Sequence, residues 1–226
     1  MKRYLLPRLL ALGCLATATS LQAVVLVQTS DPGFYNDSIG TVLNQTAANG
    51  GETGMFPISN DGSFTYNTAP DLTAAASALG NWLTNPLSLN SNWTYETNIP
   101  NTWIPGTEVA VMYQFNTLGA TNVVAKFGVD NGIFVWLDGN YIGGARAGGH
   151  AVPWEYQYNI GNLSAGTHFL QLLLEDHGGS NGYLVEITAD TYTPGPPPSS
   201  VPESGSFLVF GFALAFLGGL RRFVRR

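Results

Sequence analysis

Cysteine is nearly absent from this chain of 226 residues, which has only Cys14. Cys14 lies in the N-terminal apolar stretch, so a mature chain that has lost this stretch has no thiol and no disulfide framework. The fold therefore has to rest on a hydrophobic core. Because Cys14 follows Leu12 and Gly13, acylation of the thiol is an alternative, although Arg8 interrupts the apolar segment before it.

Basic residues are scarce in the central part of the chain. Between residues 24 and 200 the only ones are Lys126 and Arg146, against fourteen Asp and Glu, so the formal charge of this region is two minus fourteen, or −12. Binding of nucleic acid requires a basic surface that neutralises phosphates, so nucleic acid is excluded as a partner. Polyanionic polysaccharide is disfavoured for the same reason, whereas neutral sugars and metal cations remain open.

Patterns of several catalytic sites are also missing. The three histidines, His150, His168 and His177, show no paired spacing of the kind found in zinc sites. Glycoside hydrolysis needs two carboxylates about 5 to 10 Å apart. The candidates for such a pair are Glu155 with either Glu175 or Asp176. Carboxylates are common in this region, so the sequence favours no particular pair. We therefore do not expect an enzyme.

Residues 1–23 have the layout of a secretory signal peptide. Lys2 and Arg3 precede an apolar stretch from Leu5 to Ala18, which is too short to span a bilayer stably. Small residues follow, and we expect cleavage near Ala23. This segment predicts that the chain is exported.

A second apolar stretch, residues 206–220, carries no charge and is followed by a basic C-terminus. The arginines are Arg221, Arg222, Arg225 and Arg226. We expect a transmembrane helix over about residues 205–222, with the Arg-rich end 221–226 in the cytoplasm and the domain outside. A C-terminal helix buried in the domain is the alternative, but four arginines in six residues argue against burial.

A Pro-rich segment, residues 193–200, predicts an extended linker between the domain and this tail, residues 201–226. The tail begins with Val201, Pro202 and Glu203. The order of this motif, the apolar stretch and the terminal arginines resembles the PEP-CTERM sorting signal of bacteria, although Ser204 stands where the family usually has a second proline. The resemblance implies recognition by a membrane protease of the exosortase type, followed by release or attachment to extracellular polymer.

Residues 24–192 predict one mainly β domain. Short segments rich in β-branched and aromatic residues are bounded by Gly, Asn, Asp or Pro. The expected strands are 24–27, 108–115, 122–129, 132–137, 154–160, 167–174 and 183–189. Such a series favours an antiparallel β-sandwich, and Asp138 with Gly139 is typical of a hairpin turn. In the N-terminal half, residues 71–85 predict a short helix capped by Asp71.

Three features resemble the galactose-binding-like jelly-roll domains that accompany many glycoside-processing enzymes and surface proteins. They are Trp103 before a strand, VDNGIFVWLDGNYIG at residues 129–143, and LSAGTHFLQLLLED at residues 163–176. The resemblance implies a jelly-roll β-sandwich and leaves the ligand open.

Three residues are candidates for contact with a sugar. Trp154 follows a Gly-rich segment, residues 143–149, that we expect to form a loop, and Arg146 in this segment is the only arginine of the domain. Asp138 lies in the expected hairpin turn. Aromatic rings with one polar edge suit sugar stacking, whereas Trp136 inside an apolar strand is expected to be packed. A solvated loop charge is the alternative for Arg146.

Four residues are candidate ligands of Ca²⁺, which prefers carboxylate and carbonyl oxygens and tolerates loops. They are Asp130, Asn131, Glu175 and Asp176. The spacing matches no EF-hand, and a glycine-rich turn with exposed carboxylates is the alternative.

The sequence as a whole predicts an exported cell-surface or extracellular-matrix protein with a non-catalytic binding or structural domain. Its expected partners are the membrane, through the C-terminal helix, a processing protease and extracellular polysaccharide. The alternative is a secreted carbohydrate-active enzyme or a dedicated carbohydrate-binding module.

Overall fold

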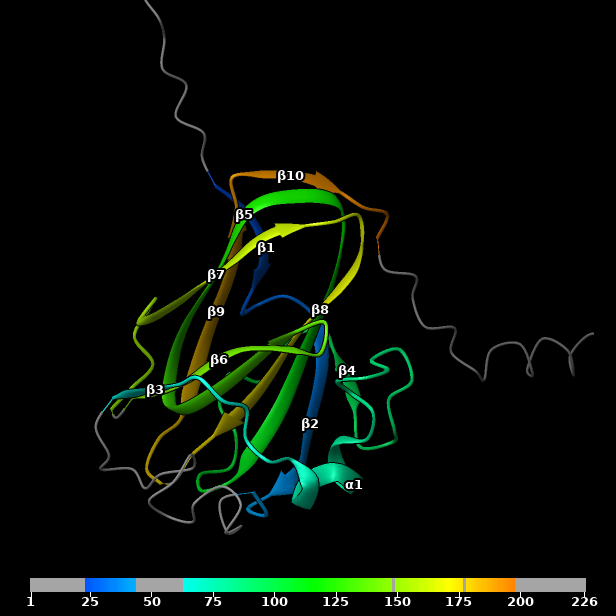
Figure 1. Ribbon diagram of the computed structural model, residues 1–226. Coiled ribbons are helices and arrows are strands. Elements are labelled where there is room, and N and C mark those ends of the chain that lie inside the picture. The colour runs from blue at the N-terminus through cyan, green and yellow to red at the C-terminus, as the bar shows by residue number, and fades with distance from the viewer. Residues whose placement is uncertain (1–22, 44–62, 148, 177, 198–226) are drawn as a thin grey trace, which may run out of the picture.

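The computed structural model describes residues 23–43, 63–147, 149–176 and 178–197 (Figure 1). Its strands are β1 (Val24–Gln28), β2 (Gly33–Gly40), β3 (Phe64–Tyr66), β4 (Thr94–Glu96), β5 (Glu108–Leu137), β6 (Asn140–Ala147), β7 (Tyr156–Leu163), β8 (Gly166–Glu175), β9 (Gly182–Ala189) and β10 (Thr191–Pro194). A 3₁₀ turn, η3 (Thr73–Ala75), and a short helix, α1 (Ala76–Leu79), lie between β3 and β4. The prediction of a mainly β domain with a short helix in its N-terminal half is confirmed.

Strand β5 organises the sheet because it is 30 residues long and changes neighbours along its length. Its first part, residues 108–117, lies between β2 and β8. Its middle part, residues 120–130, lies between β7 and β9, and β1 pairs with the other edge of β9. Its last part, residues 132–137, lies between β8 and β6. All of these pairings are antiparallel.

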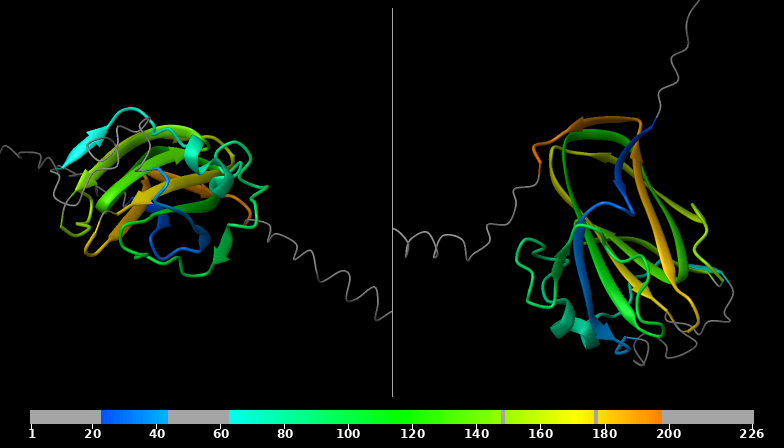
Figure 2. Two further views of the ribbon diagram at one scale, coloured as in Figure 1. Left: turned by 90° about the horizontal axis from the view of Figure 1, so that it is seen from below. Right: turned by 180° about the vertical axis from the view of Figure 1, so that it is seen from behind.

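The sheet curls, so that the strands around β9 face the strands around β8 (Figure 2). Successive side chains of a strand point to opposite faces, and every second residue therefore points into the curl. The enclosed core draws on both groups of strands: Val111 and Leu172 come from one, and Phe127 and Ile187 come from the other. Each of these four side chains is fully buried.

A second apolar cluster covers the outer face of the strands around β8. Met112, Phe134 and Leu173 point outward from the sheet, and Leu79 of α1 and Trp82 pack on them. The chain between β3 and β4 therefore covers this face of the sheet. Trp136 belongs to the same cluster and is 3% exposed, as the sequence predicts.

The strands expected near β1, β7, β8 and β9 are confirmed. The segments 108–115, 122–129 and 132–137 differ from expectation because they form one strand. The backbone between them stays hydrogen-bonded, since Gly119 pairs with Thr193 of β10 and Asp130 pairs with Gly182 of β9. The residues between the expected strands, which we expected to be turns, are therefore bends within the continuous strand β5.

The expected hairpin turn is confirmed between β5 and β6. Asp138 and Gly139 both have positive φ, 51° and 76°, as a two-residue type I′ turn requires. The carboxylate of Asp138 also ties the turn to β8. Its Oδ1 accepts a hydrogen bond from the Phe169 N–H at 2.8 Å, and its Oδ2 lies 2.7 Å from Nδ1 of His168.

The helix is shorter than the sequence predicts. Asp71 accepts hydrogen bonds from the side chain and the backbone N–H of Thr73, which lower the pKa of this exposed carboxyl. The helix ends at Leu79 because Gly80 adopts a φ of +60°. The carbonyl of Leu79 then accepts a hydrogen bond from Nε1 of Trp93 at 3.0 Å. Residues 80–85 are therefore not helical.

The prediction of a loop over residues 143–149 is wrong, because Gly143 to Ala147 belong to β6. The glycines leave room for aromatic rings against the strand. A Cβ on Gly143 would lie 2.5 Å from the ring of Tyr158, and one on Gly144 would lie 2.7 Å from the ring of Phe134. Glycine here serves close packing of the sheet.

The two ends of the chain lie outside the described residues. The signal peptide, the sorting motif at 202–204 and the transmembrane helix expected at about 205–222 therefore remain predictions. Within the described ranges, no helix is long and apolar enough to cross a membrane.

Substitutions of two glycines on neighbouring strands test the packing of the curl. A Cβ on Gly128 would lie 2.1 Å from the carbonyl oxygen of Val152, whereas one on Gly182 would make an ordinary 3.5 Å contact with Asn101. We expect Gly128→Ala to lower the free energy of unfolding by about 1 to 3 kcal/mol because backbone must move. Gly182→Ala should change it by no more than about 0.5 kcal/mol. Urea denaturation of both variants measures this, and equal losses would contradict the packing.

Candidate functional site

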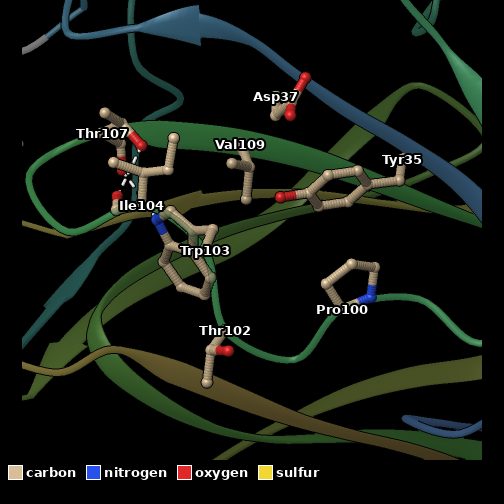
Figure 3. Close-up of a pocket in the computed structure, with 8 residues that line it drawn as sticks. All are labelled: Tyr35, Asp37, Pro100, Thr102, Trp103, Ile104, Thr107 and Val109. Atoms are coloured by element: carbon tan, nitrogen blue, oxygen red, sulfur yellow. Dashed lines mark hydrogen bonds between the residues drawn. The ribbon is translucent and has the colours of Figure 1, made fainter.

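A cavity of about 420 Å³ opens between β2, the segment before β5 and the start of β5. Its lining residues are Tyr35, Asp37, Pro100, Thr102, Trp103, Ile104, Thr107 and Val109 (Figure 3). Ligand pockets in proteins commonly measure about 300 to 1,000 Å³. The cavity is therefore large enough for one or two sugar rings.

One wall of the cavity is apolar and comes from the segment before β5. Nε1 of Trp103 donates a hydrogen bond to the carbonyl of Thr107 at 2.8 Å, and Oγ1 of Thr107 donates one to the carbonyl of Ile104 at 2.7 Å. These two bonds close a tight turn and fix the indole ring (Figure 3). Ile104 at the edge of this turn is 69% exposed.

The facing wall is polar and comes from β2. Tyr35 and Asp37 are two residues apart, so both point to the same side of the strand. Burial, and then the carboxylates of Asp37 and Glu96, raise the pKa of Tyr35 to about 12. The phenol is therefore protonated at neutral pH and offers an O–H donor. Its hydroxyl points across the cavity toward Val109 (Figure 3).

The apolar wall is held from behind by two polar side chains of the β8 to β9 segment. Oδ1 of Asn181 accepts a hydrogen bond from the Trp103 N–H at 2.9 Å, and its Nδ2 donates to the carbonyl of Trp103 at 2.9 Å. Oδ2 of Asp176 accepts a hydrogen bond from the Gly106 N–H at 2.7 Å. The position of the wall therefore depends on the end of β8.

Behind this wall lies a small group of buried oxygen donors. Asp130 and Asn131 are 2% and 5% exposed, and Asp176 is fully buried. Burial, and then the nearby charge of Asp176, raise the pKa of Asp130. Oδ1 of Asp176 has no hydrogen-bond partner among the described residues. Two of the four predicted calcium ligands, Asp130 and Asp176, therefore lie near each other, and Asn131 follows Asp130 in β5.

The fourth predicted ligand, Glu175, lies on the other face of the sheet. It belongs to β8 directly opposite Glu108 and Gly132 of β5, on the face that carries Leu173. Both Glu175 and Glu108 are fully buried, and Glu175 occupies the space above Gly132. Glu175 and Asp176 are consecutive residues, so their side chains lie on opposite faces of the sheet.

The oxygens of Asp130, Asn131 and Asp176 are of the kind that Ca²⁺ prefers, with backbone carbonyls and water able to complete its coordination. Two carboxylates and one amide are few for such a site. In the part of the chain that the structure describes, no group of three or more His, Cys, Asp or Glu is arranged to hold a metal ion.

The predicted sugar contacts Arg146, Trp154 and Asp138 have separate partners. The guanidinium of Arg146 lies 5.6 Å from the centre of the Phe64 ring, and Nζ of Lys126 lies 5.8 Å from the centre of the Trp154 ring. Asp138 is bonded in the hairpin turn. None of the three lines the cavity.

Of the hydrolase candidates, Asp176 and Glu155 both lie near Asp130, whose pKa is raised by burial and then by their charges, but they make different backbone hydrogen bonds. Glu155 is exposed and its Oε2 accepts a hydrogen bond from the Val129 N–H at 3.2 Å. Glu175 is buried on the outer face of the sheet, and Asp176 holds the Gly106 turn.

The sequence did not single out Tyr35, Asp37 or Ile104. Tyr35 and Asp37 at alternate positions of an N-terminal strand give a weak local signal, and the Pro100 to Gly106 segment looks like an ordinary loop. Only the pairing of β2 with the first part of β5 brings them together.

Comparison with known proteins finds neither a matching family model nor a matching curated protein. Solved structures are similar to the chain in part. The PA14 sugar-binding domain from an RTX adhesin is 14% identical, with a TM-score of 0.33, over 74% of this chain and 95% of that domain. The epithelial adhesin 6 A domain of Candida glabrata, in complex with Galβ1-3GlcNAc, is 8% identical, with a TM-score of 0.28, over 78% of this chain and 91% of that one.

A β-glucuronidase of Bifidobacterium dentium is similar with 14% identity and a TM-score of 0.36. The similarity covers 61% of this chain but only 31% of the enzyme.

Proposed function

We propose that this chain is an exported protein whose β domain binds carbohydrate without catalysis, in the cavity between Tyr35 and Trp103. The cavity itself carries the proposal. It combines a fixed apolar wall, a phenolic O–H donor and one carboxylate in a space suited to a sugar ring. Sugars present both an apolar C–H face and a rim of hydroxyls, so a site with one apolar and one polar wall is complementary to them.

The count of carboxylates favours binding over hydrolysis. Among the described residues that line the cavity, Asp37 alone carries a charge. Glycoside hydrolases require an acid and a base or nucleophile on opposite sides of the scissile bond. A single carboxylate serves as an acceptor for sugar hydroxyls. A secreted carbohydrate-active enzyme is therefore the weaker candidate.

We further propose that the curled sheet is a β-sandwich of the jelly-roll kind. The core enclosed between the strands around β8 and the strands around β9 supports this, since a sandwich packs two sheets over one apolar layer. The domain has no cysteine and so no disulfide, and this extensive apolar layer has to stabilise it outside the cell.

The ends of the chain support export and sorting. Residues 1–23 have the layout of a signal peptide, and residues 201–226 that of a PEP-CTERM-like tail. In this proposal the domain lies outside the cytoplasm, on the cell surface or in the matrix, and an exosortase-type protease processes the tail near Pro202 and Glu203.

The mass of the native protein tests the sorting proposal. In a host that carries an exosortase-type protease, we expect the protein in the envelope or medium to lack both residues 1–23 and most of 203–226. Intact-mass spectrometry of the fractions measures this. Full-length protein retained in the membrane would show instead that the tail is an ordinary anchor.

Calcium is proposed as a structural ligand of Asp130, Asn131 and Asp176, since repulsion between the two buried carboxylates would be relieved by a cation. A ligand of the folded state raises stability by mass action. We expect millimolar CaCl₂ to raise the melting temperature of the wild-type protein, and Asp130→Asn to abolish the rise. Glu175→Gln should retain it, because Glu175 lies on the other face. An unchanged wild-type melting temperature in CaCl₂ and in chelator would exclude the site.

Binding of neutral oligosaccharides tests the cavity. Titration calorimetry with N-acetylglucosamine, glucose and xylose tetramers should give a measurable Kd for at least one. Tyr35→Phe removes one hydrogen-bond donor and should weaken that binding roughly fivefold. Tyr95→Phe is the matched control, because Tyr95 is 60% exposed and does not line the cavity. Equal losses in both variants would contradict the assignment of the cavity.

A further inference from the structure

We infer that the cavity selects a sugar that bears a protonated amino group, a glucosamine-type unit, over neutral and acidic sugars. The inference rests on the proposed carbohydrate binding and names the class of ligand. It comes from the distribution of charge around Tyr35 and Asp37, which the shape of the cavity alone does not specify.

The first step is that the negative charge at the cavity is not neutralised by a basic residue of the domain. Only Lys126 and Arg146 are available between residues 24 and 200. Nζ of Lys126 lies 3.0 Å from Oε1 of Glu186, and Arg146 stacks on Phe64. Asp37 is exposed to solvent and lines the cavity, so its carboxylate is available to a cationic group of a ligand.

The second step is that a second carboxylate adds to the negative potential. Asp37 and Glu96 both raise the pKa of Tyr35, which places both charges near the phenol. Glu96 is on β4, opposite Gly33 of β2, beside the strand that carries Asp37. A ligand carboxylate brought to this wall would be repelled by both, so uronic acids are disfavoured.

The third step is the match between the two walls and an aminated sugar. A sugar ring with its C–H face on Pro100 and Ile104, beside the edge of Trp103, directs its substituents toward β2. An ammonium group there meets the carboxylate of Asp37 and the oxygen and ring of Tyr35. Charge-assisted hydrogen bonds and cation–π contacts both favour a cation at such a position.

A bare metal ion fits the cavity less well than an organic cation. Calcium takes six to eight oxygen ligands, and the lining residues supply one carboxylate with hydroxyls and an apolar wall. The apolar wall gives a metal ion nothing to bind, whereas it contributes buried area to a sugar ring. The occupant therefore has one charged group on an apolar body.

Paired tetramers test the inference on the purified exported protein. Calorimetry compares the glucosamine tetramer with its N-acetylated counterpart, which has the same ring and linkage without the charge. We expect the glucosamine tetramer to bind about tenfold more tightly, as for one charge-assisted hydrogen bond. Raising the NaCl concentration should weaken only the glucosamine tetramer, because salt screens exposed charges.

Asp37→Asn should remove this preference, so that the glucosamine tetramer and its N-acetylated counterpart bind with equal affinity. Asp190→Asn is the matched control and should retain the preference, since Asp190 lies in the β9 to β10 turn, where it accepts a hydrogen bond from Asn122. Equal affinity of the wild type for both tetramers overturns the inference and leaves the proposed function in place. If neither tetramer binds, the inference is overturned, and the proposed function falls too if the glucose and xylose tetramers also fail to bind. A preference that survives Asp37→Asn overturns the inference as well.

Discussion

Strand β8 is hydrogen-bonded along both edges to the same strand, β5, and the remaining structure depends on this arrangement. Residues 108–117 of β5 lie on one side of it and residues 132–137 on the other. Burial on both faces and pairing on both edges explain why Leu170 to Glu175 are all fully buried. To reach both edges of β8, β5 bends away from it and then returns. The middle part of β5 pairs with β7 and β9 and forms the facing layer of the curl.

The cavity is an indirect product of the same arrangement. Where β8 ends, Asp176 binds the Gly106 N–H, while Asn181 binds both the N–H and the carbonyl of Trp103. The apolar wall is thereby positioned by residues that never touch the cavity. The opposite wall needs only two side chains on β2, whose place is set by its pairing with the first part of β5.

Local pattern was enough to predict most strands, the hairpin at Asp138 and the packed Trp136, because alternation and turn chemistry are local properties. Prediction from local pattern failed where contacts with residues distant in sequence determine the conformation. The helix ends at Leu79, where Gly80 turns the chain and Nε1 of Trp93 binds the Leu79 carbonyl, and Gly143 lies in a strand against which the Tyr158 ring packs. The cavity residues were missed for the same reason, and the predicted group of calcium ligands included Glu175, which the sheet places on the other face from Asp176.

The outermost pairing of the sheet joins the two ends of the domain, since Val24 of β1 lies opposite Ala189 of β9. Contacts between residues so far apart in sequence make folding slow, because the entropy of closing the intervening chain is lost before the contacts can stabilise the fold. Neither β8 nor β9 exists until the last third of the domain has been synthesised. The sheet therefore cannot close around β8, the strand that β5 pairs with on both edges, until most of the domain has been synthesised.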